Sequence, residues 1–296
     1  MVIVCYNGVA DTLECLASVA RLTYPNVQTV VVDNASTDGT AGAVREAFSR
    51  VHVIETGDNT GFAGGNNVGV RFALDTLGAA YTFLLNNDTT VEPGLLEPLV
   101  AHTEAHPAAG IVAPLMCYHA VPDTVWSAGG AMNHRAEAAH VSAGRPVAAF
   151  ESHAPRSHDF VAGCGMLIRR DVWERVGLFD ERFFLYYEDA DLCFRARRAG
   201  YACVVVPGVR LWHKVSRSTG ATSDLTLYYM RRNALLFLRK HSAAAGRLAA
   251  LADDARLFAL WTLRGNNRRA TVLRRAVADY FAKRFGRGGS QTPIKK

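Results

Sequence analysis

Short apolar runs rich in valine alternate with longer amphipathic stretches over residues 1–115 of the chain. This alternation is typical of βαβ units, which build a mostly parallel sheet covered by helices. Apolar residues recur at helical spacing between the runs, so the helices are predicted there. The predicted strands are Val2–Cys5, Val27–Val32, Val51–Glu55, Tyr81–Leu85 and Gly110–Leu115, and the predicted helices are Asp11–Leu22, Thr40–Ser49, Ala63–Leu77 and Gly94–His106. The fold class is therefore α/β, and ligands are expected at the carboxyl edge of the sheet.

The pattern is less regular from Tyr118 to His158, where we expect an irregular or antiparallel excursion. Regular elements return after it, and their ends carry acidic residues, glycines or prolines of the kinds that start and stop helices and strands. They are an apolar segment at Phe160–Arg169, helices at Asp171–Val176 and Asp189–Ala199, a strand at Tyr201–Val206 that ends at Pro207, and helix from Leu225 onward. The residues from Gly286 to Lys296 are expected to be a disordered tail.

The composition is that of an ordinary globular protein. The chain has 296 residues, of which 49% are hydrophobic and 20% are charged, and this excludes collagen-like and disordered classes. Its six cysteines form no closely spaced pair, so we expect reduced thiols. We expect no signal peptide, because no basic stretch precedes the apolar residues Met1–Tyr6. The best candidate for a membrane span, Leu248–Leu263, contains three charged residues, so we expect none, and a cytoplasmic location follows.

Charge is distributed unevenly. Residues 1–224 contain 17 Lys and Arg and 24 Asp and Glu, a net charge of −7, whereas residues 225–296 contain 16 and 3, a net charge of +13. The basic last quarter predicts either an anionic partner or a helix with a solvated basic face. Because Leu225–Lys240 mixes apolar and basic residues as an interfacial helix does, an anionic membrane surface is one expected partner of residues 225–285. A helix packed on the rest of the chain is the alternative.

Polar residues gather where the second predicted strand ends. Asp33 directly follows the valines at 30–32 and is placed to accept a hydrogen bond from a ligand, although a carboxylate there can also cap the next helix. Asp38, later in the same loop, is expected to be such a cap. The glycine-rich run Asn59–Asn67 lets backbone N–H groups approach an anion at a helix N-terminus, but it is equally consistent with a tight turn. It matches neither a dinucleotide-binding fingerprint nor a P-loop.

Two later clusters also suggest chemistry. Asn86, Asn87 and Asp88 end the fourth predicted strand and offer hard oxygen ligands of the kind Mg²⁺ or Mn²⁺ prefers, with a helix cap at Asp88 as the alternative. The carboxylates at 188, 189 and 191 follow an aromatic run. Like charges at this spacing raise at least one pKa, which suits a general base, whereas a helix dipole acting on them would lower their pKa values. His213 follows an apolar strand end, and its spacing alone favours an ordinary histidine.

Taken in order, these blocks resemble those of family 2 glycosyltransferases, the inverting nucleotide-sugar enzymes of the GT-A fold, especially bacterial rhamnosyltransferase-like and galactofuranosyltransferase-like members. The matching blocks are Val4–Asn7, Val31–Thr40, Asn59–Asn67, Leu85–Thr89, Ala162–Arg169, Gly177–Glu181 and Glu188–Asp191. The resemblance implies a catalytic domain at 1–222, with a nucleotide-sugar half at about 1–115 and an acceptor half at about 116–222. A basic helical region at 223–285 and the tail at 286–296 would follow. The implied location is cytoplasmic or peripheral at the inner face of the membrane.

The resemblance also implies roles for individual residues. Asp189 would be the catalytic base, with Glu188 and Asp191 orienting the base or the acceptor. Asp88, Asn86 and His213 would bind a divalent cation, Mg²⁺ or Mn²⁺, that bridges the diphosphate of the donor. Asp33 would accept the imide N–H of uracil or thymine. The implied donor site comprises Tyr6, Asn7, Asp33, Asn59, Gly61, Phe62, Gly64, Asn66, Asn67 and Asn87.

The implied reaction moves a sugar from a dTDP or UDP donor, with L-rhamnose from dTDP-rhamnose favoured, to a hydroxyl of a glycan or lipid-linked glycan. A UDP-sugar donor carrying galactofuranose, GlcNAc or a hexose is the alternative, and no nucleic acid partner is expected. One departure bears on the metal, because Asn86-Asn87-Asp88 stands where many relatives show Asp-x-Asp. Two other classes remain as alternatives. A nicotinamide oxidoreductase would need a glycine-rich turn where Tyr6-Asn7-Gly8 stands, and a polyanion-binding module would explain only residues 225–296.

Overall fold

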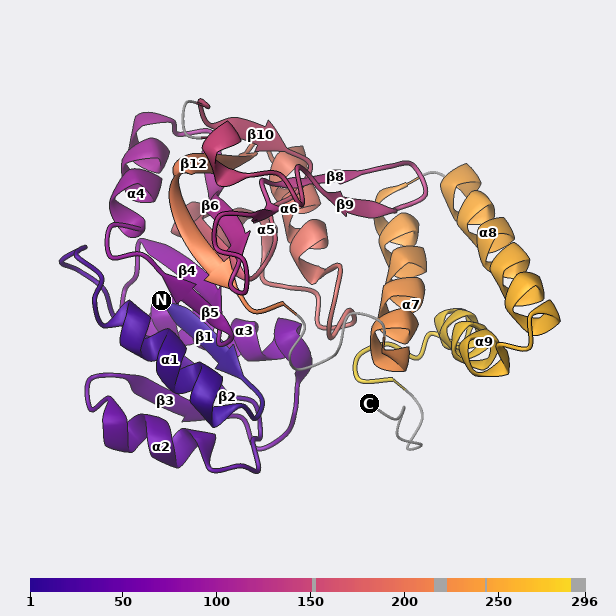
Figure 1. The fold of residues 1–296 in the computed structure, drawn as a ribbon, viewed down its shortest axis with the longest axis horizontal. Coiled ribbons are helices and arrows are strands. Elements are labelled where there is room, and N and C mark those ends of the chain that lie inside the picture. The colour runs from indigo at the N-terminus through magenta and orange to yellow at the C-terminus, as the bar shows by residue number, and fades with distance from the viewer. Residues whose placement is uncertain (151–152, 216–222, 243, 289–296) are drawn as a thin grey trace.

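The computed structural model describes residues 1–150, 153–215, 223–242 and 244–288, and it shows one large curved sheet with helices around it (Figure 1). In the described residues the sheet has the strand order β10-β12-β6-β11-β4-β1-β2-β3, with β5 paired to β12 and β7 paired to β6. Strands β4, β1, β2 and β3 run parallel to one another, whereas β11 lies antiparallel between β4 and β6. This is the mostly parallel α/β sheet that the hydrophobic pattern predicts.

The first part of the chain contains every strand and helix predicted there, with ends shifted by a few residues, and also the short strand β5, which was not predicted. A π-helical turn at Phe72–Thr76 extends α3. The elements are β1 Val2–Cys5, α1 Val9–Val19, β2 Val30–Asp33, α2 Thr40–Ala47, β3 His52–Glu55, α3 Gly61–Arg71, β4 Tyr81–Asn86, β5 Thr89–Val91, α4 Leu96–Ala105 and β6 Ala109–Tyr118.

The expected excursion after β6 consists of short antiparallel strands and a 3₁₀ turn at Val147–Ala149. Its strands β8 and β9 form a separate hairpin that projects toward the C-terminal helices (Figure 1). The remaining elements are β7 Val125–Ser127, β8 Gly130–Met132, β9 Ala138–His140, β10 Arg156–His158, β11 Gly165–Arg169, α5 Arg170–Val176, α6 Glu188–Arg198, β12 Ala202–His213, α7 Asp224–His241, α8 Ala244–Leu263 and α9 Asn267–Phe281.

Strand β12 does not end at Pro207, as the sequence suggested. It continues to His213, because the register with β6 shifts between Val206 and Arg210 and the proline falls in that irregularity. A proline in a bulge removes no ladder hydrogen bond, so the strand can resume beyond it. The extension pairs His213 with Thr89 of β5, directly after Asp88.

Helix α7 packs against the rest of the molecule instead of lying open to a surface. Its buried side chains include two tyrosines and a continuous apolar run at 235–238. The interfacial interpretation of Leu225–Lys240 is therefore wrong and the packed alternative holds. Helices α8 and α9 lie beyond α7, at the end of the molecule farthest from the sheet (Figure 1). No helix in the described ranges is long and apolar enough to span a bilayer.

All six cysteines are buried and free, as expected. The first residues of the expected tail differ from the prediction. The N–H of Gly286 donates to the carbonyl of Arg182 at 2.8 Å, and the Tyr229 hydroxyl donates to the carbonyl of Arg287 at 2.8 Å. The rest of the tail, residues 289–296, lies outside the described residues.

Candidate active site

The loops after β1 and β2 are tied together by side chains. Asn7 Oδ1 accepts from the N–H of Thr37 at 2.9 Å, and Asp38 Oδ2 accepts from the N–H of Gly8 at 2.6 Å. Asp38 Oδ1 also accepts from the N–H of Thr40, in the first turn of α2, at 3.1 Å. Asp38 therefore satisfies the N–H of the first residue of α2, although Gly39 holds the N-cap position. Tyr6 lies in the first of these loops with 41% of its surface exposed.

Asp33 is buried at the end of β2. Its Oδ1 accepts from the N–H of Ser36 at 2.6 Å, whereas its Oδ2 is buried without a hydrogen-bond partner in the described structure. An unpaired buried carboxylate oxygen costs free energy that a ligand N–H can recover. The arrangement therefore suits a ligand that donates a hydrogen bond to Asp33.

Asn34 is a residue that the sequence analysis missed. It is buried, and its Oδ1 accepts from both the N–H and the hydroxyl of Thr60 at 2.9 Å. Its Nδ2 donates to the carbonyl of Gly61 at 2.9 Å and to Asn59 Oδ1 at 3.3 Å. One amide thus fixes the glycine-rich loop against the end of β2. Its position next to Asp33 after a valine run was the signal available.

Two glycines of this run, both in the first turn of α3, have protein atoms where a Cβ would lie. Gly61 has φ +75°, and a Cβ there would lie 2.4 Å from the carbonyl oxygen of Phe184. A Cβ at Gly64 would lie 2.6 Å from the side chain of Thr60. Asn59 Oδ1 meanwhile accepts from the N–H of Gly61 at 2.9 Å. Both glycines therefore allow close packing at the start of α3, and the approach of an anion to the backbone N–H groups here stays a prediction.

The asparagines of α3 also form internal links. Asn66 Nδ2 donates to the carbonyl of Phe62 at 2.9 Å. The amide of Asn67 donates to the carbonyl of Phe179 at 3.0 Å and to Glu181, and its oxygen accepts from the N–H of Phe179 at 2.9 Å. Asn67 therefore joins α3 to the segment before α6, and both of its amide hydrogens are used there.

Asp88 and His213 form a buried pair. Asp88 Oδ1 lies 3.2 Å from His213 Nε2, and Asn86 hydrogen-bonds the same carboxylate. Although burial raises the pKa of Asp88, His213 lowers it below its usual value. Burial likewise lowers the pKa of His213, but Cys164 and Asp88 raise it to about 10. Asn87 points elsewhere, because its Nδ2 donates to Thr12 of α1 at 2.9 Å.

The donor atoms at this pair fit a divalent cation in part. Asn86 Oδ1 is buried without a hydrogen-bond partner among the described residues, and His213 Nε2, the ring nitrogen that faces Asp88, would have to lose its proton to bind a cation. A carboxylate oxygen and an imidazole nitrogen that share one octahedral cation lie about 3 Å apart, which agrees with the separation of Asp88 and His213. No group of three or more His, Cys, Asp and Glu gathers as a metal site in the described ranges. These residues therefore supply part of a coordination sphere.

Asp189 lies in the first turn of α6 and remains partly accessible. Its Oδ2 accepts from the N–H of Gly163 at 2.9 Å, and burial raises its pKa above the usual value. Neighbouring Glu188 is more deeply buried, and its Oε2 has no hydrogen-bond partner in the part of the chain that the structure describes. Burial and the charge of Asp189 raise the pKa of Glu188 well above its usual value. A general base needs a raised pKa, and the pKa values of Asp189 and Glu188 are both raised.

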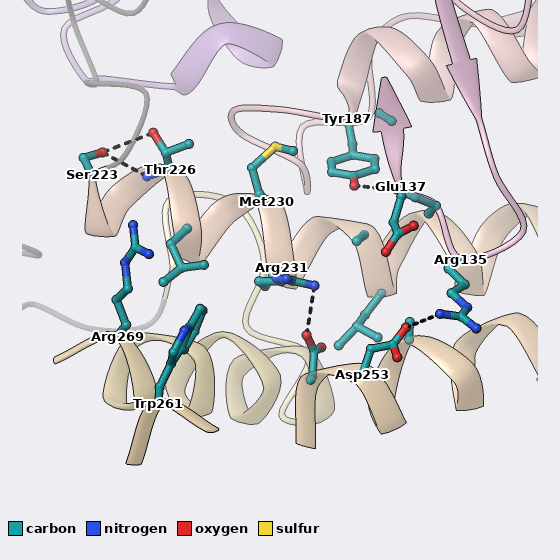
Figure 2. Close-up of a pocket in the computed structure, with 17 residues that line it drawn as sticks. Arg135, Glu137, Tyr187, Ser223, Thr226, Met230, Arg231, Asp253, Trp261 and Arg269 are labelled. Carbon is teal, nitrogen blue, oxygen red and sulfur yellow. Dashed lines mark hydrogen bonds and ion pairs between the residues drawn. The ribbon is translucent and has the colours of Figure 1, made fainter. Parts of the chain in front are cut away.

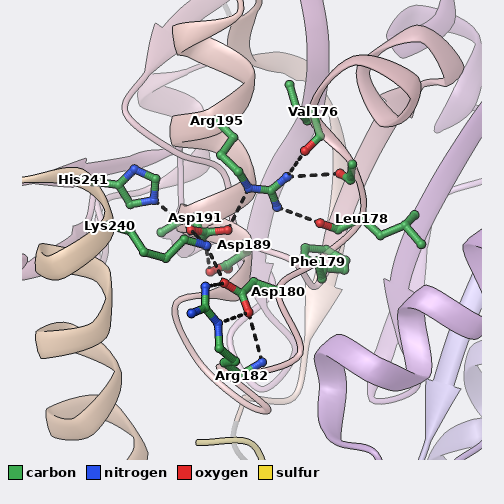
Figure 3. Close-up of polar contacts among 12 residues, drawn as sticks. Val176, Leu178, Phe179, Asp180, Arg182, Asp189, Asp191, Arg195, Lys240 and His241 are labelled. Carbon is green, nitrogen blue, oxygen red and sulfur yellow. Dashed lines mark hydrogen bonds and ion pairs between the residues drawn. The ribbon is translucent and has the colours of Figure 1, made fainter. Parts of the chain in front are cut away.

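Asp191 differs from its neighbours. Its fully buried carboxylate lies 2.9 Å from Arg195 Nε, 2.5 Å from Lys240 Nζ and 2.7 Å from His241 Nε2 (Figure 3). Burial raises the pKa of Asp191, but the hydrogen bond with His241 and the charges of Arg195 and Lys240 lower it below its usual value. Lys240 also contacts Asp180 Oδ2 at 2.6 Å. Asp191 thus joins α6 to α7, and its implied role in orienting the base or the acceptor stays a prediction.

The loop before α6 is held by two buried residues of α7 that the sequence analysis missed. Phe184, Tyr186 and Tyr187 all have positive φ, a strained conformation for residues other than glycine. Asn233 Nδ2 donates to the carbonyls of residues 183, 185 and 186 at 2.8 Å each. Arg232 donates to the carbonyls of 182 and 183. The sequence of this basic helix did not indicate that Arg232 is buried, because an arginine in such a helix is normally assigned to its solvent-exposed face.

The carboxylates of Asp88 and Asp189 are connected through one short segment. The carbonyl of Cys164 accepts from the N–H of Asn86 at 3.2 Å, and Cys164 contacts the side chain of His213. The adjacent Gly163 donates to Asp189. A Cβ at Gly163 would lie 3.0 Å from the ring of Phe62, so this aromatic residue reaches the same place. The fold therefore brings the two acidic clusters to one region.

The sequence pattern described as glycosyl transferase family 2 matches residues 1–177. The chain belongs to this family. It is similar to an N-acetylglucosaminyl-diphospho-decaprenol L-rhamnosyltransferase from Mycobacterium tuberculosis, at 27% identity over 90% of this chain and 89% of the relative. It is also similar to the dTDP-rhamnosyl transferase RfbF from Shigella flexneri, at 26% identity over 81% of this chain and 79% of the relative.

Solved structures agree on the fold of this family 2 glycosyltransferase. A structure of GalNAc-T7 with UDP, GalNAc and Mn²⁺ is similar with a TM-score of 0.63 and 18% identity, and the match covers 80% of this chain but 47% of that one. The mannosyltransferase PcManGT from Pyrobaculum calidifontis, in complex with GDP-Man and Mn²⁺, is similar with a TM-score of 0.54 and 18% identity over 99% of this chain and 76% of that one. The GT-A fold with added C-terminal helices is therefore confirmed, and the protein is a glycosyltransferase.

The glycosyltransferase also contains a cavity of about 440 Å³ between the β8–β9 hairpin and helices α7, α8 and α9 (Figure 2). Its polar lining mixes cations such as Arg135 and Arg231 with the acids of α8. Burial raises the pKa of Asp254 to about 6, although Arg231 lies 3.2 Å away. The residues implied by the family resemblance do not line it. Tyr187, two residues before Asp189, is the lining residue nearest to them in sequence.

Proposed function

We propose that the protein transfers a sugar with inversion from a nucleoside-diphosphate donor to a hydroxyl of a glycan or lipid-linked glycan, and that the favoured donor is dTDP-L-rhamnose. The names of the mycobacterial and Shigella relatives both specify rhamnose, and the second specifies dTDP. The mycobacterial name also specifies an acceptor carried on diphospho-decaprenol. Both similarities extend over most of this chain and over most of each relative, so they support a related substrate pair.

The connection of Asp88 and Asp189 through residues 163 and 164 is the observation that carries the proposal. Displacement at an anomeric carbon needs a charge-neutralising group at the departing diphosphate and a base at the attacking hydroxyl. The two acidic clusters have different surroundings that suit these tasks. The pKa of Asp88 is lowered, so it stays ionised beside a cation, whereas the pKa of Asp189 is raised, so it takes up a proton more readily.

Asp189 would act on the acceptor. As the acceptor oxygen forms a bond to the anomeric carbon, its proton passes to Asp189 and the bond to the nucleoside diphosphate breaks on the opposite face. A single in-line displacement of this kind inverts the anomeric configuration. The raised pKa of Glu188 favours its protonated form, which would reduce the negative charge beside the base.

Asp88, Asn86 and His213 would hold a divalent cation, Mg²⁺ or Mn²⁺, with donor phosphates as further ligands. Such a cation neutralises the charge that develops on a departing diphosphate. At the other end of the donor, the free Oδ2 of Asp33 would accept the imide N–H of thymine or uracil. Tyr6, Asn7, Asn59 and Phe62 would flank the donor. The single carboxylate at 86–88 predicts modest affinity for the cation in the absence of nucleotide.

A donor screen tests this proposal. We expect dTDP-rhamnose to give the largest thermal stabilisation and the fastest Mn²⁺-dependent donor hydrolysis. A larger response to UDP-galactofuranose, UDP-GlcNAc or a UDP-hexose would instead favour the alternative donor class. Stabilisation by NADH and by none of these sugars would contradict a glycosyl donor altogether.

A further inference from the structure

The chain turns back toward the catalytic part of the molecule after α9, along residues 284–288, which we call the C-terminal strap (Figure 1). The N–H of Gly286 donates to the carbonyl of Arg182 at 2.8 Å. Phe285 is half-buried and packs against the main hydrophobic core. Arg182 directly precedes the strained residues 183–187 that lead into α6. The strap therefore contacts the segment from which the proposed base follows.

A buried arginine of α7 joins the strap to this loop. Arg232 has no exposed surface, and its Nη1 donates to the carbonyl of Gly286 at 2.8 Å. Its Nη2 donates to the carbonyls of Arg182 at 3.2 Å and Phe183 at 3.1 Å. A guanidinium group is planar and rigid, so it holds the three carbonyls in a fixed arrangement. Because a buried charged donor that loses its acceptor is costly, removal of the Gly286 carbonyl would force Arg232 to move and to release the other two.

A buried tyrosine of α7 makes a second connection. The hydroxyl of Tyr229 donates to the carbonyl of Arg287 at 2.8 Å. The ring of Tyr229 stacks on the ring of Phe184, with 5.3 Å between the ring centroids and 22° between the ring planes. Arg232 Cζ lies 4.9 Å from the centroid of the Tyr229 ring, so the two connections also contact each other. The strap thus helps to fix the ring against which Phe184 packs.

Phe184 lies between the start of α3, which would flank the donor, and the start of α6. Its carbonyl accepts from the N–H of Ala63, in the first turn of α3, at 3.3 Å. Its own φ is +66°, and Tyr187, directly before α6, has φ +74°. Residues other than glycine keep such conformations only where their surroundings impose them. Contacts from outside the loop therefore determine its shape, and with it the position of Asp189 in the first turn of α6.

From these contacts we infer that the C-terminal strap is a positioning element of the active site, which acts through Arg232 and Tyr229 on the loop before α6. The inference rests on the proposed function, because the group that the loop positions is the proposed base, Asp189. Arg232 and Tyr229 are positioning residues, since they act on Asp189 only through the loop. Loss of the strap would leave α6 folded but would allow the loop, and with it the base, to move relative to α3.

Two truncations of the full chain test the inference. Deletion of residues 286–296 removes the contacts of Gly286 and Arg287, whereas deletion of residues 289–296 removes only residues outside the described ranges and is the matched control. We expect amide hydrogen exchange of the peptide 182–189 to be about tenfold faster in the longer truncation than in the shorter one, with the exchange of α5 unchanged. We also expect kcat to fall about fivefold or more in the longer truncation, with the donor Kd changed by less than about twofold.

Two neighbouring tyrosines of α7 separate positioning from general stability. Tyr229→Phe removes the hydroxyl that holds the strap but keeps the ring that stacks on Phe184. Tyr228→Phe removes an equally buried hydroxyl group, which donates to Asp279 Oδ2 of α9 at 2.7 Å, so the two variants should lose similar amounts of thermal stability. We expect Tyr229→Phe to lower kcat about threefold or more and to speed the exchange of the peptide 182–189, and we expect Tyr228→Phe to do neither.

Equal exchange of the peptide 182–189 in the two truncations would overturn the inference. The same fall in kcat in Tyr228→Phe and Tyr229→Phe would also overturn it, because the effect would then follow from stability alone. The exchange measurement uses no substrate, which keeps this result separate from the proposed function. If the parent turned over no nucleotide sugar while the longer truncation still gave faster exchange, the proposed function would fail, and the hold of the strap on the loop would be supported.

Discussion

The backbone N–H of Gly163 donates to Asp189 Oδ2 at 2.9 Å. This contact joins the segment before β11 to the first turn of α6, although the two residues lie on different elements. The same segment reaches the other acidic cluster through the carbonyl of Cys164, which accepts from Asn86. A change in the position of residues 163–164 would therefore affect both carboxylate groups, and this makes the segment a sensitive point of the proposed site.

Replacement of Asp189 by Asn should slow sugar transfer but leave donor binding unchanged. The amide keeps the size of the carboxyl and can still accept from Gly163, but it cannot take a proton from an acceptor hydroxyl. We expect transfer to fall about 10²-fold or more, with the donor Kd changed little. Single-turnover transfer and calorimetric donor binding measure the two quantities. Near-normal turnover would place the base elsewhere.

The first half of the fold could be predicted because its signals are local. Each buried strand such as β2 is a short valine-rich run, and each helix has its own apolar period. The carboxyl edge of a parallel sheet then places Asp33 and Asp88 on the same side of the molecule. These inferences need only chain neighbours and a general rule of sheet topology.

Contacts across the chain could not be predicted in the same way. Pro207 is a valid signal for the end of a strand, but the tertiary pairing of β12 with β6 absorbs it in a bulge, and this extension is what brings His213 to Asp88. The glycines at 61 and 64 are equally ambiguous in sequence, since space for a phosphate and space for Phe184 or Thr60 demand the same residue. The fold shows the packing against Phe184 and Thr60, which the sequence could not predict.

Replacement of Asp88 should remove the rise in melting temperature that depends on the metal ion. We expect Mn²⁺ with dTDP or UDP to raise the melting temperature of the parent, and we expect Asp88→Asn to abolish the part of the shift that requires the cation. Asp75→Asn changes an exposed acid on the turn after α3 and serves as the control. An unchanged metal-dependent shift in Asp88→Asn would show that the cation binds without this residue.

Asn233→Ala should impair turnover more than donor binding. The change removes one hydrogen bond from each of three carbonyls in the strained loop before Glu188, so residues 183–187 can relax and Asp189 loses its fixed position. We expect kcat to fall at least tenfold, while KM for the donor changes less than threefold. The melting temperature should also fall, because unsatisfied buried carbonyls cost about 1–3 kcal/mol each.

The control for Asn233→Ala is a second variant that loses a similar amount of stability at a site away from the loop before α6. Asn266→Ala removes the side-chain cap of α9, which accepts from the N–H of Arg269 at 3.4 Å, and should cost about 0.5–2 kcal/mol. It does not touch the loop before α6. If Asn266→Ala lowers kcat as much as Asn233→Ala does at similar stability, Asn233 has no specific role in positioning the base.

Glu188→Gln should change how stability depends on pH. Because the pKa of Glu188 is raised well above its usual value in the folded chain, the folded state keeps its proton at pH values where the unfolded state, with a pKa of about 4.3, has lost it. The unfolded state then binds fewer protons, so this group makes stability fall as pH rises from about 4.3 to the raised pKa, by up to about 1.4 kcal/mol per pH unit. Glutamine does not titrate, and the contributions of all other groups are nearly common to both proteins. Urea unfolding between pH 5 and 8 should therefore give a smaller loss of stability with pH for the variant than for the parent. Parallel curves would mean that Glu188 is ionised in the folded protein and would remove the argument that it stays neutral beside Asp189.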